Sequence, residues 1–293
     1  MRINVSRRAF VAGLALSCAP VGARADDPSR AAEQRIAALE ARAGGRLGVC
    51  VIEAKSGRRL AHRAEERFPM CSTFKALAAA SILARVDRGV ETLDRRVAYG
   101  PADLLEYAPV TKAHVADGAM ALGDLCAAAI DWSDNTAANL MLQAIGGPAE
   151  LTRYIRSIGD PVTRLDRNEP TLNTAIPGDE RDTTTPLAMA RDLEVVLLGE
   201  ALSEGSRRQL ESWMIDDKVG DKRLRAGAPA SWRIGDKTGS GDNGTANTIA
   251  ILRPPGRAPL LAAVYYTESS APMEARNAIH REVGAIIGEA FGG

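Results

Sequence analysis

Histidine is scarce in this sequence, and its scarcity argues against two classes of hydrolase. The chain of 293 residues has three histidines, His62, His114 and His280. They form neither an H-x-H nor an H-E-x-x-H pattern, as a zinc hydrolase would need. So few histidines also give a Ser-His-Asp triad little support. We therefore expect no metal and no other cofactor, and we expect the histidines to be surface or packing residues.

Cysteine is scarce too, which limits disulfide formation. Only Cys50, Cys71 and Cys126 follow the first 25 residues. An odd number allows at most one disulfide, and the spacing does not say which pair would form it. The first residues indicate twin-arginine export, whose cargo folds in the reducing cytoplasm, so we predict three free thiols. Cys71 adjoins Ser72, and we expect it to pack beneath that serine rather than to react.

Long apolar runs are missing after the N-terminus. The chain opens with paired arginines in residues 6–10 (SRRAF), an apolar stretch over 10–21 and a small-x-small cleavage pattern at 23–25. These features predict a twin-arginine secretory signal over residues 1–25. The apolar stretch is shorter than the ~20 residues of a membrane-spanning helix. A membrane anchor and lipidation at Cys18 are the alternatives, but we expect a periplasmic protein that leaves the membrane after cleavage.

An excess of positive charge is also missing. The chain has 37 basic and 37 acidic residues, and removal of residues 1–25 takes away four arginines and no acids. The mature chain therefore has 33 basic against 37 acidic residues, a net charge of −4. A mildly acidic surface argues against nucleic acid or an anionic membrane as a partner, and we expect a monomer.

Hydrophobic patterning predicts strands near both ends of the chain and helices between them. The predicted strands are Leu47–Glu53, Arg59–His62, Ser231–Asp236, Thr245–Leu252 and Leu260–Tyr266. The predicted helices are 31–42, 72–87, 122–130, 135–145, 149–158, 186–199, 204–214 and 278–291. We expect an α/β plus all-α fold, with one sheet built from both ends. Its α/β domain comprises residues 26–64 and 215–293, and residues 65–214 form an inserted all-helical domain.

Four short motifs occur in order along the chain. They are S-x-x-K at Ser72–Lys75, S-D-N at Ser133–Asn135, E-P-T-L-N at Glu169–Asn173 and K-T-G at Lys237–Gly239. A single S-x-x-K is expected by chance in a chain of this length, so the ordered set carries the argument. Together the motifs supply a nucleophile, two candidate bases, a proton relay and an anion anchor. This combination predicts acyl transfer followed by hydrolysis.

The spacing within the first two motifs supports that chemistry. A separation of three residues puts Ser72 and Lys75 on one helix face, so the amine can activate the weakly nucleophilic hydroxyl. Pro69 suggests that the helix begins near Ser72, where its N-terminus favours developing negative charge. Ser133 can pass a proton to a leaving nitrogen, and Asn135 adds an amide.

The last motif is predicted to lie at the end of a strand. Lys237 and Thr238 can hold a carboxylate. Gly239 and Gly241 would let the edge of a ligand approach closely.

The motifs resemble those of the class A serine β-lactamases, whose signature includes S-x-x-K, S-D-N and K-T-G. The resemblance covers residues 26–293 and includes the segments 164–173 (RLDRNEPTLN) and 180–186. It implies a five-stranded antiparallel sheet flanked by terminal helices, with the helical domain beside it. It also implies hydrolysis of penicillins and cephalosporins, hence antibiotic resistance, with small-molecule β-lactams and mechanism-based inhibitors as partners.

The resemblance assigns catalytic roles. It implies that Ser72 is the acylated nucleophile and that Lys75 and Glu169 both take part as general bases in acylation. Glu169, with Asn173, would hold the water that attacks the acyl-enzyme. Ser133 would relay a proton to the lactam nitrogen.

Substrate-binding positions follow in the same way. The backbone N–H groups of Ser72 and Ser240 would form the oxyanion hole. Asn135 would hold Lys75 and the substrate's side-chain amide, and Tyr107 would wall the cleft. Lys237, Thr238 and Ser240 would bind the substrate carboxylate, and Gly239 is a further substrate-binding position.

The loop over residues 164–182 carries Glu169 and is long for a segment without regular structure, so it needs fastening. The resemblance implies that Arg167 and Asp182 pair across its neck, and it suggests a cis peptide between Glu169 and Pro170.

The sequence also departs from the family. Many members of the family have an arginine behind the carboxylate site at the position of Ala246. Other members have a replacement arginine at the position of Arg223, so we expect the Arg223 guanidinium to reach the space behind the carboxylate site. Cys126 matches half of a disulfide in some members, but the other half is Ala79 here. Gly241 replaces the second cysteine of the disulfide found in carbapenemase-type members. The resemblance therefore does not imply that this chain hydrolyses carbapenems.

Two other functions remain open from the sequence, and the motif Glu169–Asn173 argues against both. A penicillin-binding peptidase of cell-wall synthesis shares the serine, lysine and K-T-G elements but would deacylate very slowly. A non-catalytic penicillin sensor would be tethered to a membrane and would lack the deacylating glutamate. A serine esterase is a further alternative, but it gives K-T-G no role.

Overall fold

The computed structural model describes Met1 and residues 28–292, so the predicted signal over 1–25 lies outside the described residues. The helices are α1 (Pro28–Ala43), α2 (Phe74–Asp87), α3 (Pro109–Ala113), α4 (Leu122–Asp131), α5 (Asn135–Ile145), α6 (Pro148–Ser157), α7 (Pro186–Leu197), α8 (Glu204–Ile215), α9 (Leu224–Gly227) and α10 (Met273–Gly292). The strands are β1 (Arg46–Glu53), β2 (Arg59–His62), β3 (Phe68–Pro69), β4 (Arg96–Ala98), β5 (Ala119–Ala121), β6 (Thr183–Thr184), β7 (Arg233–Gly241), β8 (Thr245–Arg253) and β9 (Leu260–Thr267). No helix in this described part is long and apolar enough to cross a membrane.

Both ends of the chain contribute to one five-stranded sheet in the order β2-β1-β9-β8-β7. All neighbouring strands are antiparallel, and β1 pairs along its whole length with β9, from Arg46 opposite Thr267 to Glu53 opposite Leu260. The predicted fold class, an antiparallel five-stranded sheet flanked by terminal helices, is confirmed.

Side chains of β9 show why this central strand is apolar throughout. Leu261, Ala263 and Tyr265 belong to a core that also contains α2, α4 and α5. The alternate residues of the strand pack instead against α1 and α10. Because successive side chains of a strand point to opposite faces, a strand covered on both faces needs an unbroken apolar run.

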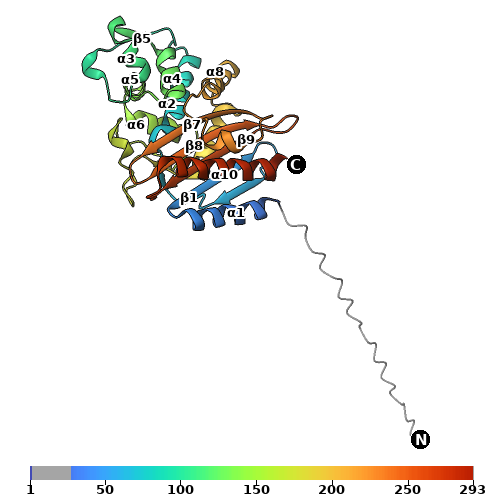
Figure 1. Cartoon of the computed structure of the whole chain (residues 1–293). Helices are drawn as coiled ribbons and strands as arrows, with labels where there is room; N and C mark the ends of the chain where they lie inside the picture. Colours follow the sequence, from blue (N-terminus) through green and yellow to red (C-terminus); the bar gives the residue numbers. More distant parts are fainter. Residues whose placement is uncertain (2–27, 293) are drawn as a thin grey trace.

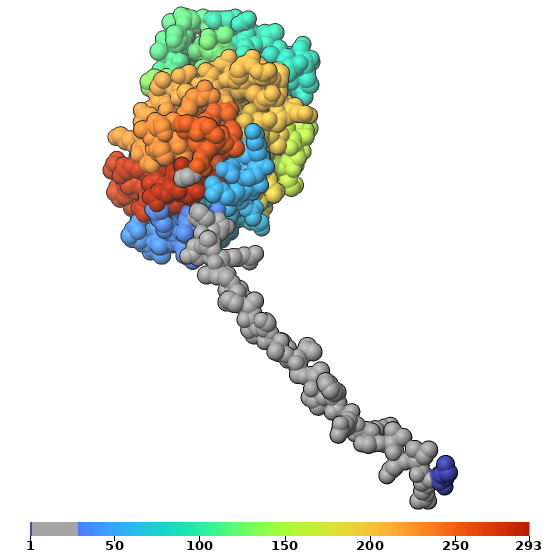
Figure 2. Space-filling view, turned by 90° about the vertical axis from the view of Figure 1, so that its right-hand side faces the viewer, coloured from blue at the N-terminus to red at the C-terminus, as the bar shows by residue number. Residues whose placement is uncertain are grey.

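The helical segment that contains α2 to α6 lies at one end of the molecule, and α1 and α10 lie at the other (Figure 1). Figure 2 shows the blue residues of α1 beside the red residues of α10, opposite the teal and green helical segment. Between them, α7 packs on β1 and β9, and α8 packs on β7. Thr185 caps the start of α7, because its Oγ1 accepts a hydrogen bond of 3.1 Å from the N–H of Ala188. The exact domain boundaries stay a prediction.

Three details differ from the sequence prediction. The strand predicted over Ser231–Asp236 extends to Gly241, so K-T-G lies within β7 and not at its end. The last helix begins at Met273, five residues before the predicted start. Residues 65–214 also contain the short strands β3 to β6, which pair as β3–β6 and β4–β5 and are too brief to give an alternating pattern.

Candidate active site

Ser72 lies at the entrance to α2, as its motif predicted. A short 3-10 turn, Cys71–Thr73, precedes the helix, and Cys71 has a positive φ of 45°. Such backbone strain persists only where the surroundings enforce it, and it often accompanies functional sites. Ser72 is nearly buried, and its hydroxyl donates a hydrogen bond of 3.2 Å to Glu169 Oε1. The hydroxyl can therefore lose its proton to a neighbour without large movement.

Lys75 lies one helical turn further on, and its side chain is completely buried. Its Nζ donates to the Ser133 carbonyl oxygen at 2.8 Å and to Asn135 Oδ1 at 2.7 Å, and it lies 3.1 Å from Glu169 Oε1. Burial lowers the pKa of the Lys75 amine, while the Glu169 carboxylate opposes this shift. Burial thus favours the neutral amine, the form that can act as a base.

Glu169 is held from both its backbone and its side chain. Its N–H donates to Asn139 Oδ1 and its carbonyl oxygen accepts from Asn139 Nδ2, each at 2.9 Å. Its Oε2 accepts a hydrogen bond from Asn173 Nδ2, and Oε1 faces Ser72. The carboxylate is therefore aimed at the serine with little rotational freedom. The cis peptide suggested between Glu169 and Pro170 is present.

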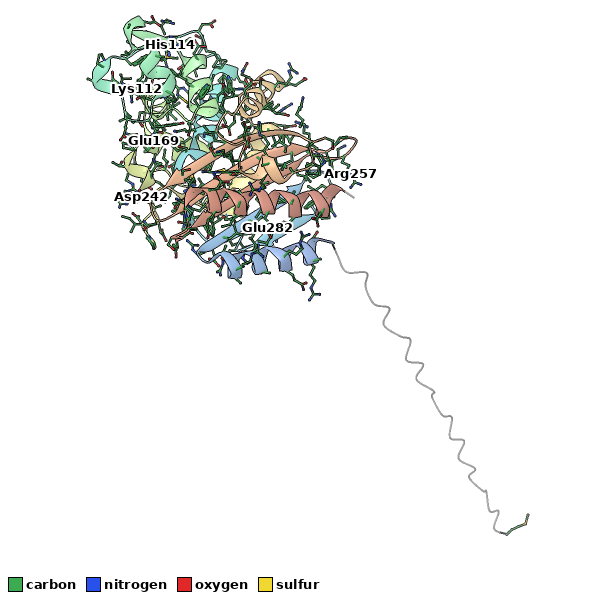
Figure 3. All side chains as sticks on the ribbon, in the orientation of Figure 1. Lys112, His114, Glu169, Asp242, Arg257 and Glu282 are labelled. Carbon is green, nitrogen blue, oxygen red and sulfur yellow. The ribbon has the colours of Figure 1, made fainter. Side chains whose placement is uncertain are left out.

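The loop over 164–182 is fastened across its neck as expected. The Arg167 guanidinium contacts Asp182 Oδ2, and the backbone N–H groups of Asp166 and Arg167 donate to Asp182 Oδ1 at 2.8 and 2.9 Å. The Asp182 side chain is fully buried. A second attachment joins the loop to the sheet, because the N–H of Asp242 donates to the Asn173 carbonyl oxygen at 2.9 Å. Figure 3 shows Glu169 and Asp242 at the same edge of the molecule.

Lys237 connects β7 to the S-D-N motif. Its Nζ donates to Ser133 Oγ at 3.0 Å and to the Thr238 carbonyl oxygen at 2.9 Å. Burial lowers the pKa of Lys237 to about 7, Asp217 opposes this shift and the charge of Lys75 adds to it. Ser133 Oγ also lies 3.5 Å from Lys75 Nζ, so one hydroxyl stands between two amines and can pass a proton.

The aspartate of the S-D-N motif has a structural role that was not predicted from the sequence. Asp134 is buried and caps α5, its Oδ1 accepting from the N–H of Ala137 at 2.8 Å. Its Oδ2 accepts from the N–H groups of Val110 and Thr111. The carboxylate thereby ties the segment that follows Tyr107 to the start of α5.

Arg223 reaches the space behind the K-T-G motif, as we expected. Its Nη1 donates to the carbonyl oxygens of Gly239 at 2.7 Å and Asn247 at 2.8 Å, and its Nη2 donates to Ser240 Oγ at 2.7 Å. Its Nε donates to Asn277 Oδ1 at 2.9 Å. Burial lowers the pKa of Arg223 to about 10, so the guanidinium is still charged at neutral pH.

The predicted residues converge on one cavity of about 310 Å³. Its lining consists of Ser72, Tyr107, Ser133, Asn135, Asn173, Val219, Arg223, Thr238, Gly239 and Ser240. The three remaining predicted residues, Lys75, Glu169 and Lys237, are buried and hydrogen-bonded to lining residues. Val219 is the one residue of this lining that was not predicted from the sequence. Half of the Tyr107 side chain is exposed, as suits a wall of the cavity.

Gly239 and Gly241 of β7 also permit close packing within the protein. A Cβ on Gly239 would lie 2.8 Å from the Met70 carbonyl oxygen. A Cβ on Gly241 would lie 2.6 Å from the Asn173 carbonyl oxygen and 2.7 Å from Cys71 Sγ. Gly239 and Gly241 therefore let β7 approach the turn before Ser72 and the glutamate loop, and the close approach of a ligand stays a prediction.

The three described cysteines are free and buried, as predicted. Burial raises the pKa of the Cys71 thiol, and the Glu169 carboxylate adds to this shift. A protonated, buried thiol is a poor nucleophile, so Cys71 packs beneath the serine as expected.

Comparison with known proteins identifies the family. A family model described as the β-lactamase enzyme family matches residues 31–291. The chain is 46% identical over 278 residues to β-lactamase CTX-M-8 of Citrobacter amalonaticus, covering 95% of this chain and 94% of the relative. An ancestral class A β-lactamase of Gram-negative bacteria superposes with a TM-score of 0.87 at 61% identity, covering 89% of this chain and all of the ancestral one. This chain belongs to the class A β-lactamases.

Membership of this class makes the protein a β-lactam-hydrolysing enzyme associated with antibiotic resistance. A structure of the class A β-lactamase PenP from Rhodopseudomonas palustris, described there as putative, gives a further match, with a TM-score of 0.87 and 54% identity over 89% of this chain and 100% of that one. The resemblance inferred from the four motifs is therefore confirmed at the level of family and enzyme class.

Proposed function

We propose that this β-lactamase hydrolyses penicillins and cephalosporins through an acyl-enzyme on Ser72 that Glu169 helps to hydrolyse. The observation that carries the proposal is the position of Glu169 Oε1, which lies 3.2 Å from Ser72 Oγ and 3.1 Å from Lys75 Nζ. One carboxylate oxygen is thus within reach of the nucleophile and of the second candidate base. A water that replaces the contact with Ser72 would lie between the carboxylate and the acylated oxygen.

In the acylation step, Ser72 Oγ attacks the β-lactam carbonyl carbon and loses its proton to Lys75 or Glu169. The carbonyl oxygen becomes an oxyanion, which the N–H groups of Ser72 and Ser240 are proposed to stabilise. Losing one such donor typically costs ~3–4 kcal/mol of barrier. When the tetrahedral intermediate collapses, the carbon–nitrogen bond breaks and Ser133 protonates the nitrogen. The network from Lys75 and Lys237 to Ser133 Oγ supplies that proton.

In the deacylation step, Glu169 removes a proton from water, and the resulting hydroxide attacks the ester carbon. The second tetrahedral intermediate releases the opened product, and Ser72 Oγ regains a proton. Asn173 and Asn139 support this assignment, because they hold the carboxylate and the backbone of Glu169. The same geometry would allow Glu169 to assist acylation, so the division of base work with Lys75 stays open.

The carboxylate common to these antibiotics is proposed to bind beside β7. Lys237 and Arg223 supply positive charge there, and the hydroxyls of Thr238 and Ser240 supply hydrogen-bond donors. Arg223 already donates to Ser240 Oγ, so it can orient that hydroxyl as well as attract the anion. Asn135 would hold the side-chain amide of the substrate, and Tyr107 would close the opposite side.

We also propose that the enzyme is exported by the twin-arginine route to the periplasm and acts as a monomer. The arginines of residues 6–10 support the route, and the net charge of −4 supports a soluble product. Replacing both Arg7 and Arg8 by lysine should keep the enzyme in the cytoplasm, as fractionation would reveal. Light scattering of the mature chain tests the monomer.

Mass spectrometry with benzylpenicillin tests the mechanism. We expect the wild type to destroy the drug over many turnovers, whereas Glu169→Ala should stall as a stable adduct on Ser72. Glu180→Ala is a matched control, because Glu180 lies in the same loop and is exposed. A wild-type protein that itself stalls as an adduct would indicate a penicillin-binding peptidase or sensor and would refute the proposed role of Glu169.

A further inference from the structure

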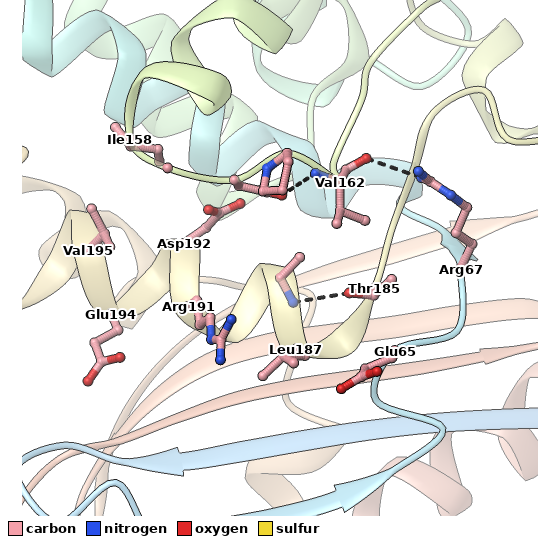
Figure 4. Close-up of a pocket in the computed structure, with 14 residues that line it drawn as sticks. Glu65, Arg67, Ile158, Val162, Thr185, Leu187, Arg191, Asp192, Glu194 and Val195 are labelled. Atoms are coloured by element: carbon pink, nitrogen blue, oxygen red, sulfur yellow. Dashed lines mark hydrogen bonds between the residues drawn. The ribbon is translucent and has the colours of Figure 1, made fainter.

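A second and larger cavity, of about 680 Å³, lies away from the catalytic residues. It is bounded by the segment 65–67, the segment 158–162 and one side of α7 (Figure 4). None of its lining residues belongs to the catalytic cavity. Its volume is within the range of ~300–1,000 Å³ that is typical of small-molecule sites.

The walls of this cavity, which we call the α7 cavity, combine apolar surface with charge. The apolar lining comprises Ile158, Pro161, Val162, Leu187, Ala188 and Val195. Besides Asp192, the charged lining comprises the carboxylates of Glu65, Asp160 and Glu194 and the guanidiniums of Arg67 and Arg191. The Arg67 guanidinium is already engaged, since it donates to the Val162 carbonyl oxygen and to Thr183 Oγ1. Carboxylates therefore outnumber guanidiniums, and a cation is the favoured occupant.

Asp192 is the unusual member of the lining. Its side chain points from α7 toward the segment that carries Ile158 and Val162 (Figure 4). It is only 2% exposed, its Oδ2 accepts no hydrogen bond from an N–H or hydroxyl donor in the described part of the chain, and its side chain hydrogen-bonds instead with the neighbouring Asp160 carboxyl. Leaving a buried polar atom without a partner normally costs free energy. A ligand that brings N–H donors could replace this contact between the two carboxyl groups.

Asp160 approaches the same place from the segment that follows α6. Its Oδ1 accepts hydrogen bonds from the N–H groups of Val162 at 2.6 Å and Thr163 at 3.2 Å. Burial, and then the neighbouring Asp160 carboxylate, raise the pKa of Asp192 to about 9. At neutral pH the Asp192 carboxyl therefore carries a proton, because burial and a neighbouring carboxylate both disfavour its charged form.

We propose that the α7 cavity binds a small organic cation with an apolar body, an amidinium or ammonium compound, through the carboxyl groups of Asp192 and Asp160. The N–H donors of the cation would replace the proton on Asp192 and hydrogen-bond to both carboxyl groups. The apolar walls would cover the body of the ligand. This site is separate from the proposed catalysis and does not depend on it.

Binding of such a cation must release a proton. Other groups near Asp192 modify the effect: Arg156 on α6 stabilises its carboxylate, while Asp160 opposes it. The titratable and charged groups around Asp192 are Tyr154, Arg156, Asp160, Arg191, Glu194, Tyr265, Glu65 and Arg67. Because Asp192 is neutral below its pKa, cation affinity should rise with pH and level off once the carboxyl is ionised in the free protein.

Isothermal titration calorimetry of the mature enzyme with benzamidine tests this site. We expect one benzamidine per chain, an affinity that rises about tenfold per pH unit between 7 and 9, and release of one proton near pH 7 measured in buffers of different ionisation enthalpy. Asp192→Asn should weaken binding at least tenfold at pH 9 and abolish the pH dependence. Glu200→Gln, just beyond the end of the same helix, exposed and outside the lining of the cavity, should change affinity less than about threefold. Amide NMR shifts should be confined to residues 158–163 and 186–195.

Several results would overturn the proposal. They are no benzamidine binding, binding without proton release, binding that penicillin acylation blocks, or an affinity unchanged in Asp192→Asn. Tighter binding of benzoate than of benzamidine would also contradict it, because the guanidiniums would then dominate the cavity. If Asp192→Asn fails to fold, proton release by the wild type still decides the question. Loss of the Ser72 adduct chemistry would refute the catalytic proposal alone and would leave this one untouched.

Discussion

Asn139 offers a sharp test of how the position of Glu169 governs turnover. Its side-chain amide makes two hydrogen bonds of 2.9 Å to the backbone of Glu169, which is only 4% exposed. In Asn139→Ala the N–H and the carbonyl oxygen of Glu169 lose these partners. Each hydrogen bond contributes about 0.5–1.5 kcal/mol net, so the variant should lose roughly 1–3 kcal/mol of unfolding free energy.

The kinetic effect should be larger than the stability loss suggests. A displacement of about 1 Å at a reacting group can cost about 10²-fold in rate. We therefore expect deacylation of the Ser72 adduct to slow about hundredfold. Acylation should slow less than about tenfold, because Lys75 keeps its contacts to Ser133 and Asn135.

Rapid-quench mass spectrometry in single-turnover mode separates the two steps. The acyl-enzyme should accumulate in Asn139→Ala and not in the wild type. Gln143→Ala is a suitable control, because Gln143 lies on the same helix and is exposed. Equal slowing of acylation and deacylation, or an unchanged deacylation rate, would refute the view that Asn139 acts by positioning Glu169.

Three further predictions concern the other supports of the site. Arg223→Ala should raise KM for penicillins and weaken clavulanate-type inhibitors about tenfold or more while changing kcat less, because the carboxylate loses a cation and Ser240 loses its donor; unchanged constants for both would contradict this. Lys237 must be charged to attract a carboxylate, and burial lowers its pKa to about 7 from 10.5, so kcat/KM should fall as pH rises through a pKa well below 10.5. The fall should move to higher pH in Lys237→Arg, whose guanidinium stays protonated, and a pH profile identical to that of the wild type would exclude this assignment. Arg167→Ser leaves the buried Asp182 carboxylate unpaired, which should cost about 3 kcal/mol of stability and slow deacylation; an unchanged deacylation rate in single-turnover kinetics would count against it.

The sequence predicted the sheet well because its strands carry clear patterns. The segments that became β1, β8 and β9 are apolar or β-branched runs broken by glycine and proline, and these signals are local. By contrast, β3 and β6 have two residues each, and their pairing of Phe68 with Thr184 depends on chain segments more than a hundred residues apart. No local pattern can indicate such a pairing.

The candidate site was predictable where a motif names a reacting group and not where a residue only supports one. Asn139 and Asn247 belong to no motif. Asn139 holds Glu169, and Asn247 donates to the carbonyl oxygens of Pro69 and Met70 beside the nucleophile turn. Both act through backbone groups, whose positions depend on the tertiary fold, so an asparagine in the sequence carries no signal of them. Arg223 was found only because the sequence lacks an arginine at Ala246.

The pairing of β1 with β9 has a consequence for how this protein is made. These neighbours join residues near position 50 to residues near position 263, so more than two hundred residues separate them along the chain. A ribosome that has released the helical segment has still not released the central strand of the sheet. The hairpin of β1 and β2 therefore stays without its neighbour β9 until the end of synthesis. The high contact order of this pairing implies slow folding. A chain truncated before Leu260 would expose the inner edge of β1, which makes premature termination an aggregation hazard rather than a route to a smaller active enzyme.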